Sequence, residues 1–235
     1  MSASQHLKNL KILWASTNHA MWVQILALRQ TNAYVVGQFD RLTDANMTDY
    51  VHAPECATRL QGFSKRKYAA ELESVIEDAV TTRLVLLSAA FEMYFADFLE
   101  AWLQRRSKYF DEATGERTPA GNKLSGEVLK VRGMVPRVEK FAELTGARIV
   151  RLKTYFDDLA DVYEIRNIIA HRAGIADLWA AGNVKGMVVT ADKPVVLTPQ
   201  RLIDYAASVI KIAEGLDSKL EGVPEAAAPK IRRKR

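Results

Sequence analysis

The chain contains a single cysteine, Cys56, among its 235 residues. One thiol cannot form an internal disulfide or a multi-cysteine metal site, and such sparing use of cysteine is typical of a reducing compartment. The first residues hold neither an uninterrupted apolar core nor a small-residue cleavage site, so we expect no signal peptide. These absences predict a cytoplasmic protein.

Long apolar runs are also scarce. The most apolar stretch, residues 84–103, is interrupted by Glu92, Asp97 and Glu100. Charged side chains at these positions are costly within a lipid bilayer. We therefore interpret this stretch as a buried helix of a globular core and expect no membrane partner.

Histidine is scarce as well, and three of the four histidines are scattered. His6, His19 and His52 lack the four-residue spacing and the nearby carboxylates that predict a metal site. The sequence also has no glycine-rich phosphate loop and no Gly-x-Ser-x-Gly motif, which leaves nucleotide-hydrolase and serine-hydrolase interpretations without support. We expect neither a metal ion nor another cofactor.

Positive charge is concentrated at one end of the chain. The formal net charge is +5, and residues 222–235 hold five basic residues against Glu225. This segment alone therefore carries +4, and the rest of the chain is close to neutral. We interpret residues 222–235 as a solvated, disordered tail, with weak nucleic-acid affinity as a second interpretation.

The first half of the chain predicts two long helices. Apolar residues over positions 7–36 indicate an N-terminal helical arm with an early break near Asn18. Residues 40–68 mix polar and turn-forming residues and predict connections. From residue 70 to about residue 108, apolar residues recur every three or four positions, which predicts a long central helix.

The second half predicts shorter elements. Turn-forming residues fill positions 111–126. Helices are expected over 128–144, with a disturbance at Gly133 and Pro136, and over 150–173; Thr145-Gly146 ends the first and Gly174 the second. Residues 184–197 alternate or are β-branched, which predicts a small β-hairpin. Thr198-Pro199 supplies the N-cap and first residue of a last helix.

These elements predict a mainly α-helical fold in three parts. Residues 1–69 form the N-terminal helical arm and connections, residues 70–221 form a helical bundle, and residues 222–235 form the basic tail. The β-hairpin is expected as a small insertion in the bundle.

An arginine occupies a core position in the helix predicted over 150–173. At 100° per residue the apolar stripe runs from Leu152 to Tyr163, and Arg166 falls within it. A buried guanidinium needs a carboxylate or an anionic ligand. Glu92 interrupts the apolar face of the central helix, so we expect it to tether or orient Arg166.

Two polar residues lie beside Arg166 on the same helix. Asn167 and His171 are four positions apart, so their side chains are neighbours. Ile165, Ile168 and Ile169 make this helix end apolar on nearly all sides. Such an end must be covered, either by the rest of the fold or by a second copy of the chain.

The segment Arg166-Asn167-Ile168-Ile169-Ala170-His171 resembles the motif of the HEPN superfamily, in which a polar residue follows an arginine and a histidine comes a few residues later. The resemblance extends over roughly residues 70–220. Within the superfamily, the chain is similar to the RiboL-PSP type or a related type. It implies a HEPN-type helical bundle that forms a homodimer through the motif helix. Two Arg–His pairs would then form one RNA-cleavage site.

The resemblance implies a metal-independent endoribonuclease. His171 would move protons during attack by the RNA 2′-hydroxyl, Arg166 would stabilise the transition-state charge, and Asn167 would orient the phosphate or the imidazole. Such proteins act as toxin or defence effectors, with an antitoxin or another regulatory protein as partner. Some carry a modified tyrosine two residues after the histidine, where this chain has Ala173.

Alternatives to catalysis stay open from the sequence. Arg166 can pair with Glu92 inside the fold, while His171 binds carbonyl groups at the helix C-terminus. The chain would then be a non-catalytic HEPN-like dimer acting as a binding or regulatory module. A third alternative is a scaffold that binds a partner protein through the N-terminal arm.

Overall fold

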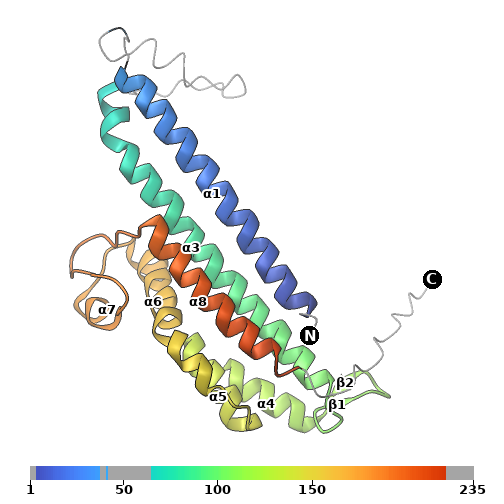
Figure 1. Cartoon of the computed structure of the whole chain (residues 1–235). Helices are drawn as coiled ribbons and strands as arrows, with labels where there is room; N and C mark the ends of the chain where they lie inside the picture. The colour runs from blue at the N-terminus through green and yellow to red at the C-terminus, as the bar shows by residue number, and fades with distance from the viewer. Residues whose placement is uncertain (1–3, 38–40, 42–64, 221–235) are drawn as a thin grey trace. The chain divides into compact units, whose positions relative to one another are not determined.

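The computed structural model describes residues 4–37, 41 and 65–220 (Figure 1). Helices dominate these residues, which confirms the mainly α fold. Cys56 and the tail 222–235 lie outside them. In chain order the elements are α1 (Gln5–Gly37), α3 (Lys65–Gln104), β1 (Phe110–Asp111), β2 (Glu116–Arg117), α4 (Pro119–Leu129), α5 (Met134–Thr145), the 3₁₀ helix η1 (Val150–Tyr155), α6 (Phe156–Arg172), α7 (Leu178–Asn183) and α8 (Pro199–Asp217).

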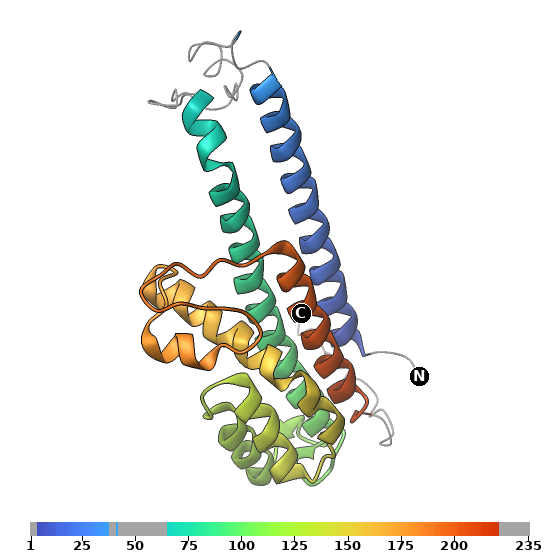
Figure 2. The ribbon, with the colours of Figure 1, turned by 60° about the vertical axis from the view of Figure 1, so that its left-hand side comes forward.

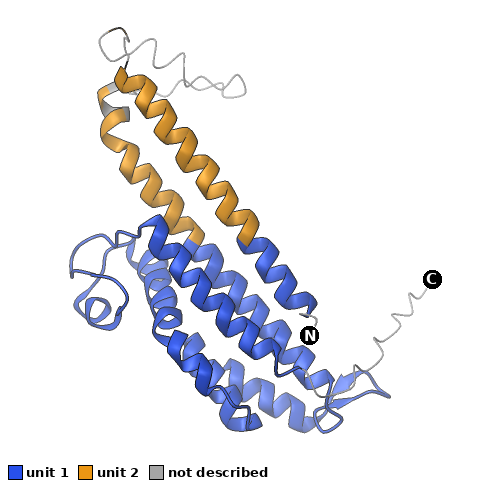
Figure 3. Ribbon diagram, viewed as in Figure 1, with its two compact units in different colours: residues 1–14, 84–235 blue, residues 15–83 orange. Residues whose placement is uncertain are grey.

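The chain divides into two compact units (Figure 3). One comprises residues 15–83, and the other comprises residues 1–14 together with 84–235. Both boundaries fall within α1 and α3, whereas the sequence predicted a boundary at residue 69.

The unit of residues 15–83 is built from the second part of α1 and the first part of α3. Met21 and Ile25 of α1 are buried, as are Ile76 and Val80 of α3. The predicted break near Asn18 is wrong, because α1 is continuous from Gln5 to Gly37. Neither glycine nor proline occurs before its last residue, so nothing in the backbone interrupts the helix.

The core of the other unit is formed by the second part of α3 with α5, α6 and α8 (Figure 2). The Tyr94 hydroxyl of α3 donates to the Ala213 carbonyl of α8 at 2.7 Å. Phe98 packs edge-on against Phe141 of α5, with ring centroids 5.2 Å apart. The predicted central helix is confirmed, although it begins at Lys65 and ends at Gln104. None of the described helices is long and apolar enough to cross a membrane.

The predicted β-hairpin at residues 184–197 is wrong. Strand pairing in the described residues occurs instead between β1 and β2, in a segment where we expected turns. Around residues 184–197 there is one isolated bridge, Ile175 with Pro194. The backbone amides of Lys185 and Gly186 cannot pair with a strand, since both donate to the buried carboxylate of Asp161, at 2.9 and 2.6 Å.

Glycine and proline set the ends of several helices. The helix predicted over 128–144 begins only at Met134, as α5, after Gly133, whose φ is 84°. The prediction of turns over 111–126 is wrong for its second part, because α4 begins there at Pro119 with Thr118 as its N-cap. Thr198 caps α8 by accepting from the Arg201 amide at 3.2 Å, with Pro199 at the first position, as predicted. The helix predicted over 150–173 begins as η1 and continues as α6.

The N-terminal residues complete the unit of residues 84–235. Ser4 donates through its amide to Asp217 at 2.9 Å, and Leu7 and Leu10 are buried. Lys11 donates to Glu214 at 2.7 Å, and Lys211 does so at 3.0 Å. Hydrogen bonding from Lys11, supported by Lys211, lowers the pKa of Glu214, although partial burial acts in the opposite direction.

We expect the contact between Lys11 and Glu214 to give a pH-dependent stability. Because the pKa of Glu214 is lower in the folded state, the stabilisation is present above the unfolded pKa and is lost as pH falls through the folded value. Lys11→Met should lower the free energy of unfolding by about 0.5 kcal/mol near pH 7. Urea titrations near pH 7 and at a pH below the ordinary glutamate pKa should show a smaller difference at the lower pH. An equal difference at both pH values would contradict the assignment.

Candidate functional site

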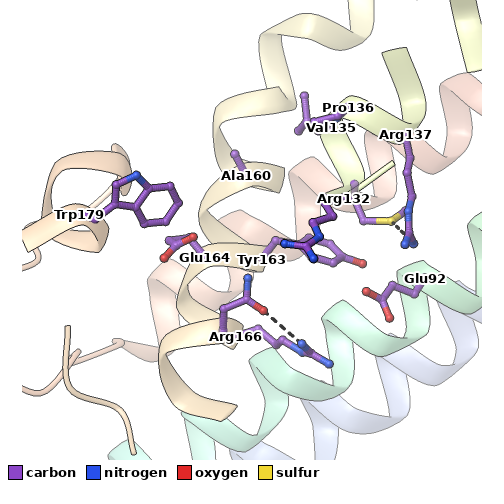
Figure 4. A pocket seen from close by; sticks show the side chains of 13 residues that line it. Glu92, Arg132, Val135, Pro136, Arg137, Ala160, Tyr163, Glu164, Arg166 and Trp179 are labelled. Carbon is purple, nitrogen blue, oxygen red and sulfur yellow. Dashed lines mark hydrogen bonds between the residues drawn. The ribbon is translucent and has the colours of Figure 1, made fainter. Parts of the chain in front are cut away.

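A pocket of about 360 Å³ lies among α3, the turn before α5, α6 and α7 (Figure 4). All of the residues that line it belong to the unit of residues 84–235. This volume lies within the range of about 300–1,000 Å³ that is usual for small-molecule sites. The polar and aromatic residues lining the pocket are Glu92, Arg132, Arg137, Tyr163, Glu164, Arg166, Asn167 and Trp179.

Arg166 and Asn167 enter the pocket from α6. The guanidinium of Arg166 donates to the Asn167 side-chain oxygen at 3.1 Å, which holds the two neighbours together (Figure 4). Arg166 is half-buried, at the edge of the apolar stripe, while Tyr163 and Ile165 are buried. Since the guanidinium opens onto a pocket, it avoids most of the desolvation cost that a core arginine would carry.

Glu92 lines the same pocket from α3, but it does not pair with Arg166. Among the described residues the two side chains form neither a hydrogen bond nor an ion pair, so the expected direct tether is absent. Glu92 lies instead near Tyr163, whose hydroxyl donates to the Ser88 carbonyl at 3.2 Å. Burial raises the pKa of Tyr163, and the negative charge of Glu92 raises it further.

Two further arginines come from the turn and first residues of α5. Arg137 is held in place, because its Nε donates to the Val131 carbonyl at 2.8 Å and its Nη1 lies 3.7 Å from the Met134 sulfur. Arg132 is exposed and makes no hydrogen bond or ion pair to any described residue. The positive φ of Gly133 forms the turn that presents Arg132. With Arg166, three guanidinium groups face two carboxylates, which favours an anionic ligand.

His171 lies outside this pocket. It is exposed in the last turn of α6 and has no hydrogen-bond partner among the described residues, so the predicted alternative of a carbonyl cap is not formed. Five residues of α-helix separate it from Arg166, which is a rotation of about 140° around the axis. The four-residue step from Asn167 leaves His171 on the Asn167 side of the helix. One copy of the chain therefore brings together Arg166, Asn167 and Glu92, without His171.

The apolar end of α6 is covered largely from within the chain. Ile165 and Ile168 are fully buried, and Ile168 packs with Ala176 and with Ala180 of α7. Ile165 and Ile168 are therefore buried by the rest of the same chain and need no second copy to cover them. Ile169 is half-buried.

Sequence reasoning missed four residues of the pocket: Arg132, Arg137, Glu164 and Trp179. The helix-breaking Gly133 between two arginines is a local signal for a presented basic turn, and it could have been used. Trp179 gives no such signal, because a tryptophan in an apolar context usually predicts core. Only the placement of α7 beside α6 shows that it faces the pocket.

No family model, curated protein or solved structure matches the chain. The fold and the pocket therefore define its class by themselves. It is a mainly α-helical protein with a pocket lined by three arginines, two glutamates and an exposed tryptophan. Within the described residues, no group of three or more histidine, cysteine, aspartate or glutamate residues could hold a metal ion.

Proposed function

We propose that the chain is an RNA-binding protein of HEPN type that cleaves RNA without a metal ion. The observation that carries the proposal is the pocket in which Arg166 and Asn167 meet Arg132 and Arg137. Guanidinium groups bind phosphate oxygens with two parallel hydrogen bonds and can stabilise the charge of a phosphorane-like transition state. The polyanionic backbone of RNA suits such a cluster.

The proton-transfer step would fall to His171. Imidazole has an ordinary pKa near neutrality, so an exposed histidine can accept a proton from a 2′-hydroxyl or return one to the leaving 5′-oxygen. Because His171 lies outside the pocket, one copy does not place it opposite Arg166 on the same phosphate. A homodimer that joins the ends of two α6 helices would bring His171 of one copy towards the pocket of the other.

A non-catalytic binding module is the second candidate function. The observation that favours it is the position of His171 outside the pocket, since binding an anionic ligand requires the arginines alone. Both functions predict binding of single-stranded nucleic acid, and only the first predicts cleavage.

The proposed ribonuclease activity also implies a location, a biological role and a protein partner. A ribonuclease of this type would act in the cytoplasm, where RNA is abundant, as a toxin or defence effector. Its activity would need restraint by an antitoxin or another regulatory protein.

We expect the wild-type protein to cleave single-stranded RNA in the presence of EDTA. Attack by the neighbouring 2′-hydroxyl on phosphorus expels the 5′-oxygen, so the products should carry 2′,3′-cyclic phosphate and 5′-hydroxyl ends. End-group analysis by mass spectrometry measures both. DNA of the same sequence lacks the 2′-hydroxyl and should survive as the matched control. RNA that stays intact while still bound would favour the binding module.

A further inference from the structure

Trp179 presents a large aromatic surface at the edge of the pocket. Its side chain is 61% exposed, and it lines the same pocket as Arg132 and Arg166 (Figure 4). Among the described residues it stacks on no other ring. An indole left in water forgoes the gain that burial normally brings, so its position beside charged groups marks a binding surface.

The backbone that carries Trp179 is well fixed. The Asp177 carboxylate accepts from the Ala180 amide at 2.8 Å and pairs with Arg172 of α6 at 2.8 Å. The Asn183 side chain donates to the Trp179 carbonyl at 2.7 Å, and Ala180 is fully buried against α6. The indole therefore stands on a rigid support, which reduces the entropy lost when a flat ligand binds to it.

The pocket offers a phosphate site close to the indole. Arg132 is exposed and has no partner among the described residues, and Arg166 uses only one of its five N–H donors, to Asn167. Both guanidinium groups can therefore bind phosphate oxygens without breaking an ion pair. A flat ring on Trp179 and a phosphate on these arginines together match the parts of a nucleotide.

Glu164 supplies an acceptor in the same pocket. It is half-buried on α6, and burial raises the pKa of its carboxyl while the nearby Arg172 lowers it. A carboxylate accepts hydrogen bonds from N–H groups at the edge of a base. Guanine presents two adjacent N–H donors on its Watson–Crick edge, which fits the two oxygens of one carboxylate.

We propose that this pocket is a nucleotide subsite in which a guanine stacks on Trp179 and donates to Glu164, while its phosphate binds Arg132 and Arg166. The choice of RNA as the natural polymer rests on the proposed function. The stacking and phosphate contacts do not need a 2′-hydroxyl, so the subsite can be tested on DNA, which the proposed reaction cannot cleave.

The test measures the dissociation constant of a short, labelled, guanine-containing single-stranded DNA by fluorescence anisotropy in EDTA. Trp179→Ala should raise this constant about 10-fold, in line with the loss of one base stack. Trp179→Phe should retain most of the affinity, whereas Trp179→Leu, which keeps apolar bulk without a flat ring, should lose it. Trp22→Ala removes a tryptophan of the other compact unit that is 41% exposed, and should change nothing.

Base preference is tested with Glu164→Gln. The wild type should bind the guanine oligonucleotide more tightly than one in which adenine replaces guanine, and the variant should lose this difference. If Trp179→Ala binds as tightly as Trp22→Ala, or if the wild type binds no oligonucleotide, the subsite is refuted even when RNA is cleaved. If Trp179→Ala binds weakly while RNA stays intact, the subsite stands and the proposed ribonuclease activity fails.

Discussion

Replacing His171 with alanine should slow RNA cleavage about 100- to 10,000-fold, the usual contribution of a general acid or base. RNA binding should stay unchanged, because His171 lies outside the arginine-lined pocket. The measurement is single-turnover cleavage of a labelled RNA by excess enzyme in EDTA, with affinity measured on the matching DNA. Since His171 is exposed and unpaired among the described residues, its removal should leave the melting temperature unchanged.

Two companion variants make this prediction specific. His19→Ala removes another exposed histidine, in the compact unit of residues 15–83, and should cleave at the wild-type rate. Arg166→Lys keeps the charge but loses the planar fork, so it should weaken binding and slow cleavage together. Undiminished cleavage by His171→Ala would remove the catalytic interpretation and leave the binding module.

Replacing Asp161 with asparagine should lower the free energy of unfolding by about 3 kcal/mol. Asp161 is 1% exposed and accepts three hydrogen bonds, from the amides of Lys185 and Gly186 and from the Tyr205 hydroxyl at 3.0 Å. An asparagine side chain would turn an NH₂ group towards one set of these donors, leaving buried N–H or O–H groups unpaired. Urea unfolding measures the loss.

The matched control for this change lies on the same helix. Asp157→Asn removes a carboxylate that pairs with the Lys185 side chain at 2.6 Å, but both side chains are well exposed. Exposed ion pairs contribute little, so Asp157→Asn should lose far less stability than Asp161→Asn. If both variants lost the same stability, the carboxylate of Asp161 would not be what holds the segment after α7.

Helical spacing alone predicted the elements that bury a continuous apolar face. The long central helix is an example, since its pattern depends only on neighbours three or four residues away. The start of α8 was predicted from a different local signal, the Thr198-Pro199 cap. The break at Asn18 was wrong because one polar residue within a helix costs little when the next apolar turn is buried. The hairpin at residues 184–197 was wrong because the chain's amides bind to Asp161, about 24 residues earlier in sequence.

Some residues of the candidate site were predicted from the sequence and others were not. Helical phase predicted that Arg166 and Asn167 would share one end of α6, and both line the pocket. It did not predict Arg132 or Trp179, because each reaches the pocket through a turn or loop whose path depends on tertiary packing. Helical phase also shows why Arg166 and His171 diverge, since five residues do not return to the same face.

The contact of Ser4 with Asp217 has a consequence for synthesis of the chain. These residues are 213 positions apart, so the N-terminal turn of α1 cannot settle in its final position until the end of α8 has left the ribosome. Leu7 and Leu10, in the same first turns of α1, are buried in the finished protein. Docking of this end of α1 is thus a late event in folding, because it must wait until residues 213 positions further along the chain have been synthesised.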